Sequence, residues 1–493
     1  MYLNFRFITK FIGLVFIITG VCMLPALIVA VIYGENVPAS VFGACAVSSC
    51  LAGLATVLCT GRAKAQMKLR DGFLTVTLTW VTASAIGAFP FFFTGCVPSF
   101  VDAFFESASA FTSTGASVIS NPEALPKSII FWRSFSAWCG TLSLILFAVV
   151  ILPGLRLCGQ ILPKAETFSA LRYSISPKHS PSAKKIYTIY FGLTALEILL
   201  LLPCRAGFFD IVIHSLGTIS TSGFSSHATS CAYFESAYVD FVTIVFMFAA
   251  GVSFLLYFKI VSNPSKIFSA LGEDSELKLY GVLLSVSTLL LLLNLLFERI
   301  YSSPFEVFRH SLFQTASLLS TTGFSSTNYD LWPSFCHMIL FMLMLSGACS
   351  TSCGSGIKVI RVLVTLKLLK RSLSIRLHPN AVLNVKVANN TQSTEYVTSI
   401  TGYIFLYIAV FFISCILVSF DNLSLTGTIS SVLACLNNIG SGFDFTGCTG
   451  SFTPFSYFSK TVLSVLMIAG RLELFTFFML LSPNYWNPDR CLN

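Results

Sequence analysis

Charged residues are scarce in this 493-residue sequence. Only 10% of its residues are Asp, Glu, Lys or Arg, whereas 55% are hydrophobic and 48 are phenylalanine. Soluble domains carry about 25% charged residues, so the composition excludes an ordinary soluble protein. The chain is predicted to be an integral membrane protein.

Other absences narrow the function further. Neither Gly354–Gly356 nor Gly440–Gly442 has the third glycine of a Gly-x-Gly-x-x-Gly nucleotide fingerprint. The 16 cysteines are scattered, and Cys349 and Cys353 would need more ligands to hold a metal. The longest polar linkers, about 154–186 and 357–396, are too short for a soluble domain. No nucleotide site and no structural metal site are therefore expected in this chain.

Long apolar stretches dominate what is present. A spanning helix needs about 20 apolar residues, and ten segments qualify. They are 11–33, 38–60, 73–97, 131–153, 187–204, 238–260, 279–297, 334–350, 398–419 and 457–482. The first is longer than the core of a signal peptide and is predicted to be a retained span. Membrane lipid is the expected surrounding.

The chain has a net charge of +9, and its basic residues are distributed according to the predicted topology. Basic residues concentrate in the loops after even-numbered spans. They are Arg62, Lys64, Lys68 and Arg70; Arg156, Lys164, Arg172, Lys178, Lys184 and Lys185; and Lys358, Arg361, Lys367, Lys370, Arg371, Arg376 and Lys386. This is the positive-inside pattern, which places both termini in the cytoplasm. No nucleic-acid partner is expected.

Four copies of a short pattern lie between pairs of spans, at 110–117, 219–226, 319–326 and 436–443. Each follows a segment too short to span, which predicts half-helices at Phe100–Phe111, Phe209–Ile219, Phe305–Leu319 and Leu425–Asn437. A repeat of fixed period sets the architecture. The predicted units are a two-span prefix at 1–69 and pore repeats at 70–185, 186–277, 278–395 and 396–493.

Each repeat crosses the membrane twice, so all four copies are parallel and can surround one axis. The predicted fold is an all-α integral membrane protein. It has ten transmembrane helices and four re-entrant pore half-helices, in pseudo-fourfold repeats of span, pore loop and span.

The four loops have the chemistry of a cation filter. Their glycines can adopt backbone angles closed to other residues, and rings of carbonyl oxygens can replace the water shell of an alkali cation. The candidate ion-binding residues are Ser113, Thr114, Gly115, Thr221, Ser222, Gly223, Thr321, Thr322, Gly323, Asn438, Ile439 and Gly440. An ordinary turn would explain one copy, but it explains four copies in the same topological place poorly.

The last span carries two charges beyond its first turn, Arg471 and Glu473. Charge inside a bilayer is costly and usually faces protein or water. Residues two positions apart do not share a helix face. We therefore expect Arg471 to face the pore below the loops and limit flux, and Glu473 to face a neighbouring helix. The alternative is a buried ion pair that stabilises packing.

The eighth span ends in eleven small residues, 346–356. Such a run forms a poor helix and can move with little steric cost, so it is predicted to be a gate beneath the loops. The candidate gate residues are Gly347, Ser350, Thr351, Gly354 and Gly356, together with Arg471. A close-packed helix interface is the alternative.

These motifs resemble the TrkH branch of the Trk/Ktr/HKT potassium transporter superfamily. The resemblance rests on the four glycine loops, Trp132-Arg133-Ser134, Gly354-Ser355-Gly356-Ile357-Lys358 and Gly470-Arg471-Leu472-Glu473. It extends over essentially the whole chain. There are two departures. The fourth loop has Ser441 where that branch usually has proline, and the small-residue run has Ser346-Gly347 and Cys353 where more glycine and alanine would be expected.

The resemblance implies K+ uptake across the inner membrane through a K+-selective pore. It further implies a homodimer of such pores, an intramembrane gating loop, Arg471 as the pore arginine, and a separate cytoplasmic nucleotide-binding regulatory subunit. A Na+-coupled or Na+-permeable transporter of the same fold stays open, although glycine in all four loops favours K+. Whether H+ or Na+ is coupled to K+ is also open.

Two other classes fit worse. For an intramembrane aspartyl protease, Asp444 is one residue late for the Gly-x-Gly-Asp motif, and no second Tyr-Asp partner lies on a span. A non-conducting scaffold would leave the four loops unexplained. The chain is not expected to be an enzyme.

Overall fold

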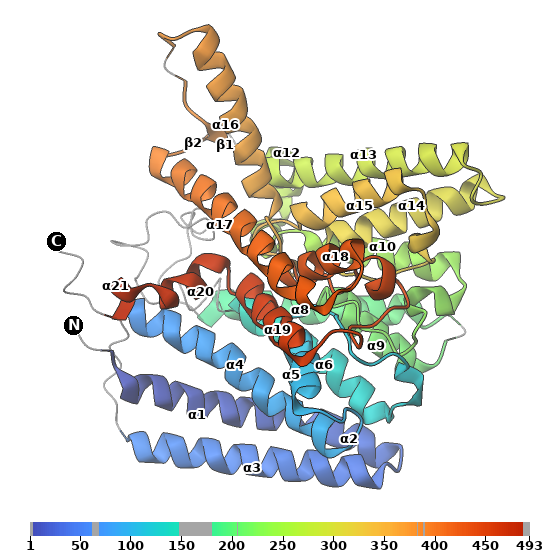
Figure 1. Cartoon of the computed structure of the whole chain (residues 1–493), viewed down its shortest axis with the longest axis vertical. Helices are drawn as coiled ribbons and strands as arrows, with labels where there is room; N and C mark the ends of the chain where they lie inside the picture. Colours follow the sequence, from blue (N-terminus) through green and yellow to red (C-terminus); the bar gives the residue numbers. More distant parts are fainter. Residues whose placement is uncertain are drawn as a thin grey trace.

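The computed structural model describes residues 3–61, 69–146, 180–204, 206–381, 383–387 and 390–486. Most of the described chain is helical, and irregular segments connect the helices. The strands of the described residues are one antiparallel pair, β1 (Lys386–Val387) and β2 (Asn390–Thr391), in which Lys386 lies opposite Thr391. Most helices run side by side in one bundle (Figure 1). The predicted all-α membrane fold is confirmed.

Three helices precede the repeats: α1 (Phe5–Cys22), α2 (Leu24–Ile32) and α3 (Asn36–Thr60). Helices α1 and α3 pack so closely that a Cβ on Gly53 would lie 2.6 Å from the carbonyl oxygen of Gly13. Together they form one edge of the bundle, beside α4 (Figure 1). Glu35, between α2 and α3, accepts hydrogen bonds from the backbone amides of Lys127 (2.6 Å) and Ser128 (3.2 Å). This carboxylate attaches the prefix to the start of α6.

The remaining helices fall into four similar groups. The first has α4 (Leu69–Phe93), α5 (Phe100–Phe111) and α6 (Lys127–Leu146); the second has α8 (Ser180–Leu201), α9 (Phe208–Ile219), α10 (Ala237–Gly251) and α11 (Phe254–Ser262). The third has α12 (Ile267–Glu273), α13 (Ser275–Phe297), α14 (Pro304–Leu319), α15 (Ser334–Ser346) and α16 (Val359–Leu377); the fourth has α17 (Thr394–Val418), α18 (Leu425–Leu436), α19 (Tyr457–Arg471), α20 (Leu474–Leu481) and α21 (Pro483–Trp486). Short 3-10 turns cover Pro122–Ala124, Ser230–Phe234, Pro264–Lys266, Tyr329–Leu331, Ser419–Asp421 and Asp444–Thr446.

Five stretches are long and apolar enough to cross a membrane unbroken: Phe5–Ile32, Asn36–Thr60, Arg70–Phe93, Ser275–Phe297 and Thr394–Asp421. Helices α6, α8 and α15 occupy the fourth, fifth and eighth predicted spans, but α15 has only 13 residues. Residues 147–153 of the fourth span lie outside the described residues.

Two predicted spans are bent rather than straight, which corrects the sequence reading. The chain turns by 90° between α10 and α11 and by 117° between α19 and α20. Glycine sits beside each break. At Gly470 a side chain would overlap the carbonyl of Leu436 in α18, and at Gly251 one would overlap the Tyr280 hydroxyl. The breaks therefore fall where the chain passes close to other elements at the centre of the bundle.

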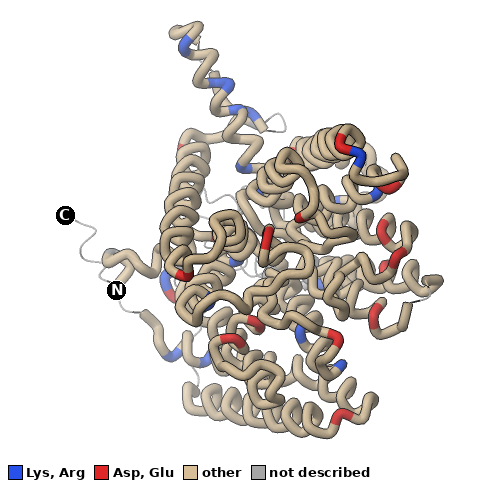
Figure 2. Tube along the Cα trace, turned by 45° about the vertical axis from the view of Figure 1, so that its right-hand side comes forward, with Lys and Arg blue, Asp and Glu red and all other residues tan. Residues whose placement is uncertain are grey.

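The charges are few and lie mainly outside the apolar spans (Figure 2). Helix α16 projects from the helical body as an arm, with Lys and Arg spaced along it (Figures 1 and 2). Of the predicted basic loops, residues 62–68 and 156–178 lie outside the described residues. The largest buried apolar cluster joins the third and fourth groups and includes Leu291, Met344 and Leu433.

Candidate ion pathway

The four glycine loops share one backbone conformation. Each follows the C-terminus of a half-helix, α5, α9, α14 or α18. The residue two before the glycine has positive φ in every copy: Ser113 55°, Thr221 52°, Thr321 61° and Asn438 51°. The glycines follow at 83° (Gly115), 67° (Gly223), 80° (Gly323) and 84° (Gly440). Positive φ is uncommon outside glycine, so its repetition in four copies marks a conformation that the surroundings enforce.

The same backbone hydrogen bond closes each loop. The amide of the residue before the glycine donates to a carbonyl five residues back, in the last turn of the half-helix. These bonds are Thr114 to Ser109 (2.8 Å), Ser222 to Gly217 (2.9 Å), Thr322 to Ser317 (2.8 Å) and Ile439 to Ala434 (2.8 Å). The fourth loop, whose residues before the glycine are Asn438 and Ile439, therefore has the same backbone conformation as the other three.

The loops meet each other in a closed ring. A Cβ added to each glycine would overlap a backbone carbonyl oxygen of the next loop. The pairs are Gly115 with Ser222, Gly223 with Thr322, Gly323 with Ile439, and Gly440 with Thr114. The glycines are thus required for both positive φ and close approach. The carbonyls of the four residues before the glycines lie at the four junctions of the ring.

Side chains behind the ring distinguish the fourth loop from the other three. In the first three, a hydroxyl three residues before the glycine bonds the hydroxyl next to the glycine. The pairs are Thr112 and Thr114 (2.7 Å), Ser220 and Ser222 (3.0 Å), and Ser320 and Thr322 (2.7 Å). Thr112, Ser220, Ser320 and their counterpart Asn437 were not among the predicted site residues. Their polar character at the same offset in all four copies is the signal that could have found them.

In the fourth loop, two side-chain amides make the hydrogen bonds behind the ring. Asn437 donates to the carbonyl of Met344 (2.7 Å) and accepts from the Tyr407 hydroxyl (2.9 Å). Asn438 donates to Thr114 Oγ1 of the first loop (2.8 Å) and to the carbonyl of Met467 (2.9 Å). The ring is therefore only pseudo-fourfold, with its fourth member fastened to α15, α17 and α19.

Arg471 lies beside the ring, at the end of α19, and is only 4% exposed. Its guanidinium donates to the carbonyl of Cys353 (2.7 Å), Ser355 Oγ (3.2 Å), Thr141 Oγ1 (3.0 Å) and, more weakly, Ser113 Oγ of the first loop (3.5 Å). All four partners are uncharged. Among the described residues no carboxylate pairs with Arg471, so the buried ion pair considered from the sequence is not formed.

Glu473, two residues on, faces elsewhere as expected. Its carboxylate pairs with Lys358 and, at 2.8 Å, with Arg361, both at the start of α16. Arg361 also lies over the ring of Tyr403 on α17, 3.6 Å from the centroid.

The small-residue segment, defined here as residues 347–358, is not helical: α15 ends at Ser346 and α16 begins at Val359. The alternative of a helix interface is therefore wrong. On one side the segment touches the third loop. Ser355 N donates to Thr321 Oγ1 (3.2 Å), and a Cβ on Gly354 would lie 2.8 Å from both Ser320 O and Thr321 Oγ1. Gly356 faces Asn437 of the fourth loop.

On its other side the segment lines the break between α10 and α11. Cys349 N donates to Gly251 O (3.0 Å), and Cys353 N donates to Ala250 O (3.2 Å). Thr351 accepts the amide of Phe254 (3.1 Å) and bonds the hydroxyl of Ser253 (2.8 Å). Gly347 abuts the carbonyl of Ser355, which folds the segment back on itself. Ser350 bonds Glu276 of α13 (2.8 Å).

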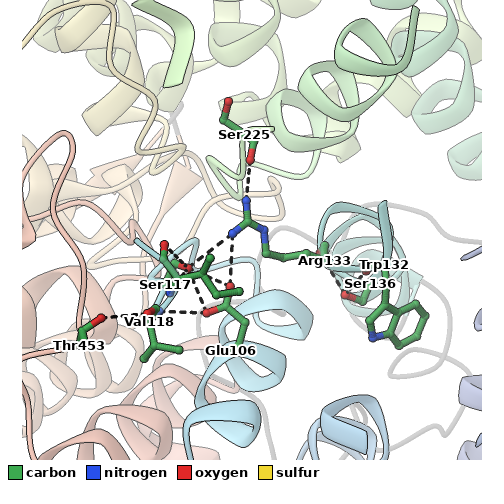
Figure 3. Close-up of polar contacts among 9 residues, drawn as sticks. Glu106, Ser117, Val118, Trp132, Arg133, Ser136, Ser225 and Thr453 are labelled. Carbon is green, nitrogen blue, oxygen red and sulfur yellow. Dashed lines mark hydrogen bonds and ion pairs between the residues drawn. The ribbon is translucent and has the colours of Figure 1, made fainter. Parts of the chain in front are cut away.

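A buried polar cluster on α5 and α6 ties three of the connecting segments together (Figure 3). Glu106 accepts from Ser117 Oγ (3.0 Å) and Val118 N (3.0 Å), and pairs with Arg133 at 3.5 Å. Arg133 also donates to the carbonyl of Ser225, beyond the second loop. Thr453, from the fourth group, donates to Val118 O (2.9 Å). These bonds join the connecting segments that follow the first, second and fourth glycine loops.

Comparisons with known proteins agree with this architecture. Residues 39–487 match the TrkH family, described as a cation transport protein. The chain is 34% identical to the Trk system potassium uptake protein TrkH of Vibrio parahaemolyticus, covering 98% of this chain and 100% of that protein. It is 32% identical to the TrkH protein of Escherichia coli K12, with the same coverage.

A crystal structure of the potassium transporter TrkH from Vibrio parahaemolyticus superposes with a TM-score of 0.90, at 32% identity, over 98% of this chain and 100% of that one. Family match, identity and fold agree over nearly the full length, and the chain belongs to the TrkH family of cation transport proteins.

Proposed function

We propose that this chain mediates potassium uptake across the inner membrane, with the ring of four glycine loops as its K+-selective filter. The observation that carries the proposal is the closure of the ring, in which each glycine meets the carbonyl of the next loop. The relatives named potassium uptake proteins support K+ as the transported ion. They do not favour the Na+-coupled or Na+-permeable alternative.

The ring suits a dehydrated cation. Four carbonyls at the junctions, from Thr114, Ser222, Thr322 and Ile439, supply oxygen ligands that can replace water. The carbonyls of Ser113, Thr221, Thr321 and Asn438, and of the four glycines, supply adjacent levels. Each half-helix ends at its loop, so the negative end of its dipole adds to the attraction for a cation.

The small-residue segment and Arg471 act as the gate in this proposal. The segment lies against the third and fourth loops, and Arg471 bonds both the segment and the first loop. A positive charge so close to the ring opposes the entry of cations. Conduction then requires the segment, with Gly347, Ser350, Thr351, Gly354 and Gly356, to move away.

The assembly follows from the family resemblance. We propose a homodimer in membrane lipid, with both termini in the cytoplasm and a separate nucleotide-binding regulatory subunit. Residues 1–69 form the prefix, and 70–185, 186–277, 278–395 and 396–493 form the pore repeats.

The test is uptake of radioactive rubidium by a strain that lacks K+ uptake, with growth at low K+ as a second measurement. Rescue is expected when the chain is expressed with a regulatory subunit. No uptake from well-expressed protein, with or without that subunit, would overturn the proposal. Flux measured with Na+ as the only cation separates the alternative, because a K+-selective ring predicts little Na+ entry.

A further inference from the structure

Two carboxylates from different groups hold the start of α16. Glu276, in the first turn of α13, accepts three hydrogen bonds at Oε1: from Ser350 N (2.6 Å), Ser350 Oγ (2.8 Å) and Ile360 N (3.2 Å). Glu473, between α19 and α20, pairs with Lys358 and Arg361. The middle of the small-residue segment and its C-terminal end are therefore each bonded to a carboxylate outside the segment.

Glu276 accepts a backbone amide at the start of α16, where the local sequence provides no capping side chain. The first amides of a helix lack intrahelical acceptors and are usually satisfied by a capping side chain. The residue before α16 is Lys358, which provides no side-chain cap and has φ of 57°. Glu276 provides an acceptor from another helix and, through the same oxygen, binds Ser350, ten residues earlier. One carboxylate oxygen thus joins the middle of the segment to the helix that follows it.

We propose that Glu276 is a positioning residue that holds the small-residue segment against the ring, with Glu473 as a second anchor at Lys358. This inference rests on the proposed gating role of the segment. Hydrogen bonds to an ionised carboxylate are among the stronger ones, and Glu276 accepts from both the amide and the hydroxyl of Ser350. Helix α16 begins at these contacts and projects beyond the helical body (Figure 1), so a displacement of α16 acts first on Glu276 and Glu473.

The experiment compares Glu276→Ala, Glu276→Gln and Asp274→Asn in liposomes that contain the full chain without a regulatory subunit. Asp274 is the matched control. It caps α13 through the amides of Glu276 and Leu277, has no hydrogen bond to the segment, and asparagine preserves an N-cap. The alanine variant is expected to raise basal rubidium flux by roughly tenfold, since a lost hydrogen bond to a charged group shifts an equilibrium by about that factor. The glutamine variant keeps an acceptor oxygen and should give a smaller increase, and Asp274→Asn should match the wild type.

A second measurement does not depend on flux. Cys349 and Cys353 in the segment are 1% and 0% exposed. Their labelling by a water-soluble maleimide, read peptide by peptide, should be faster in Glu276→Ala and unchanged in Asp274→Asn. The glutamine variant keeps the test available if the alanine variant does not fold.

The outcomes separate the two proposals. If Arg471→Ala raises flux while the Glu276 variants change neither flux nor labelling, the segment gates but Glu276 does not position it, and the inference is overturned. If labelling rises in Glu276→Ala while flux is unchanged in both Glu276→Ala and Arg471→Ala, Glu276 positions the segment and the gating role fails. Equal effects in Asp274→Asn would also overturn the inference, because the charge alone would then explain them.

Discussion

The ring of glycine loops and the small-residue segment against it are both irregular backbone at the centre of the molecule, yet they are held differently. The ring is held by its own repeat: each loop is closed by a bond to its own half-helix and abuts the next loop through backbone atoms. The segment is held both by backbone bonds to the break between α10 and α11 and by side chains from elsewhere, notably Glu276, Ser253 and Arg471. The ring contacts recur in four equivalent loops, whereas the side-chain contacts of the segment occur once each and can be removed individually. This difference suits a fixed filter and a movable gate.

The largest expected effect comes from breaking the ring. In Gly323→Ser the new Cβ would overlap the carbonyl of Ile439 at a φ of 80°. Overpacking and an unfavourable backbone conformation each cost about 1–3 kcal/mol. Loss of K+ uptake or of K+ preference over Na+ is expected in rubidium flux with Na+ competition.

Gly281→Ala is the control for that change. It lies on α13 of the same group, with nothing within 4 Å of an added Cβ. Normal flux and selectivity in Gly323→Ser would remove this glycine from the filter and leave the ring as a packing feature.

Arg471→Ala tests the contact between the ring and the small-residue segment. A full charge acting over roughly 10 Å at an effective dielectric of about 20 is worth about 1.7 kcal/mol, so flux is expected to rise by roughly tenfold to twentyfold. Single-channel or liposome flux measures it.

Arg471→Lys separates charge from hydrogen bonding. Lysine keeps the charge but cannot reproduce the planar set of donors that reaches Cys353, Ser355 and Thr141. Its flux should stay nearer the wild type if charge dominates. If the lysine variant conducts as well as the alanine variant, the hydrogen bonds to the segment are what restrain it.

The smallest effect is expected behind the ring. Thr322→Val removes the hydroxyl that bonds Ser320, worth about 1 kcal/mol, while the backbone that forms the ring stays. A change of less than tenfold in K+ preference is expected. Thr288→Val is the matched control, because its hydroxyl is buried on α13 with no hydrogen-bond partner in the described structure. A loss as large as that of Gly323→Ser would mean that side chains, not backbone, maintain the third loop.

The bounds of the half-helices could be predicted from local sequence, whereas the bends in two spans could not. The half-helix ends were predicted within one residue, because a short apolar segment followed by a polar glycine loop has few other foldings inside a membrane. The bends at α10–α11 and α19–α20 were not predicted. Their composition is continuously apolar, and it does not reveal that Gly251 approaches Tyr280 or that Gly470 approaches α18 beside the breaks.

Among the site residues, Arg471 was recognisable because an arginine inside an apolar span is costly and so carries information by itself. Glu276 was not, because a carboxylate at the start of a helix is ordinary in sequence. Its three hydrogen bonds arise from residues 74 and 84 positions away.

The amino-acid sequence alone determined the membrane class, the four parallel repeats and the glycines of the loops, since each depends on composition or on residues close in the chain. Only the tertiary structure decided the order of contacts around the ring, the amide fastenings of the fourth loop and the carboxylates that hold the small-residue segment. Those depend on which distant backbone oxygens and side chains share the little space at the centre of the bundle, and local sequence does not encode that proximity.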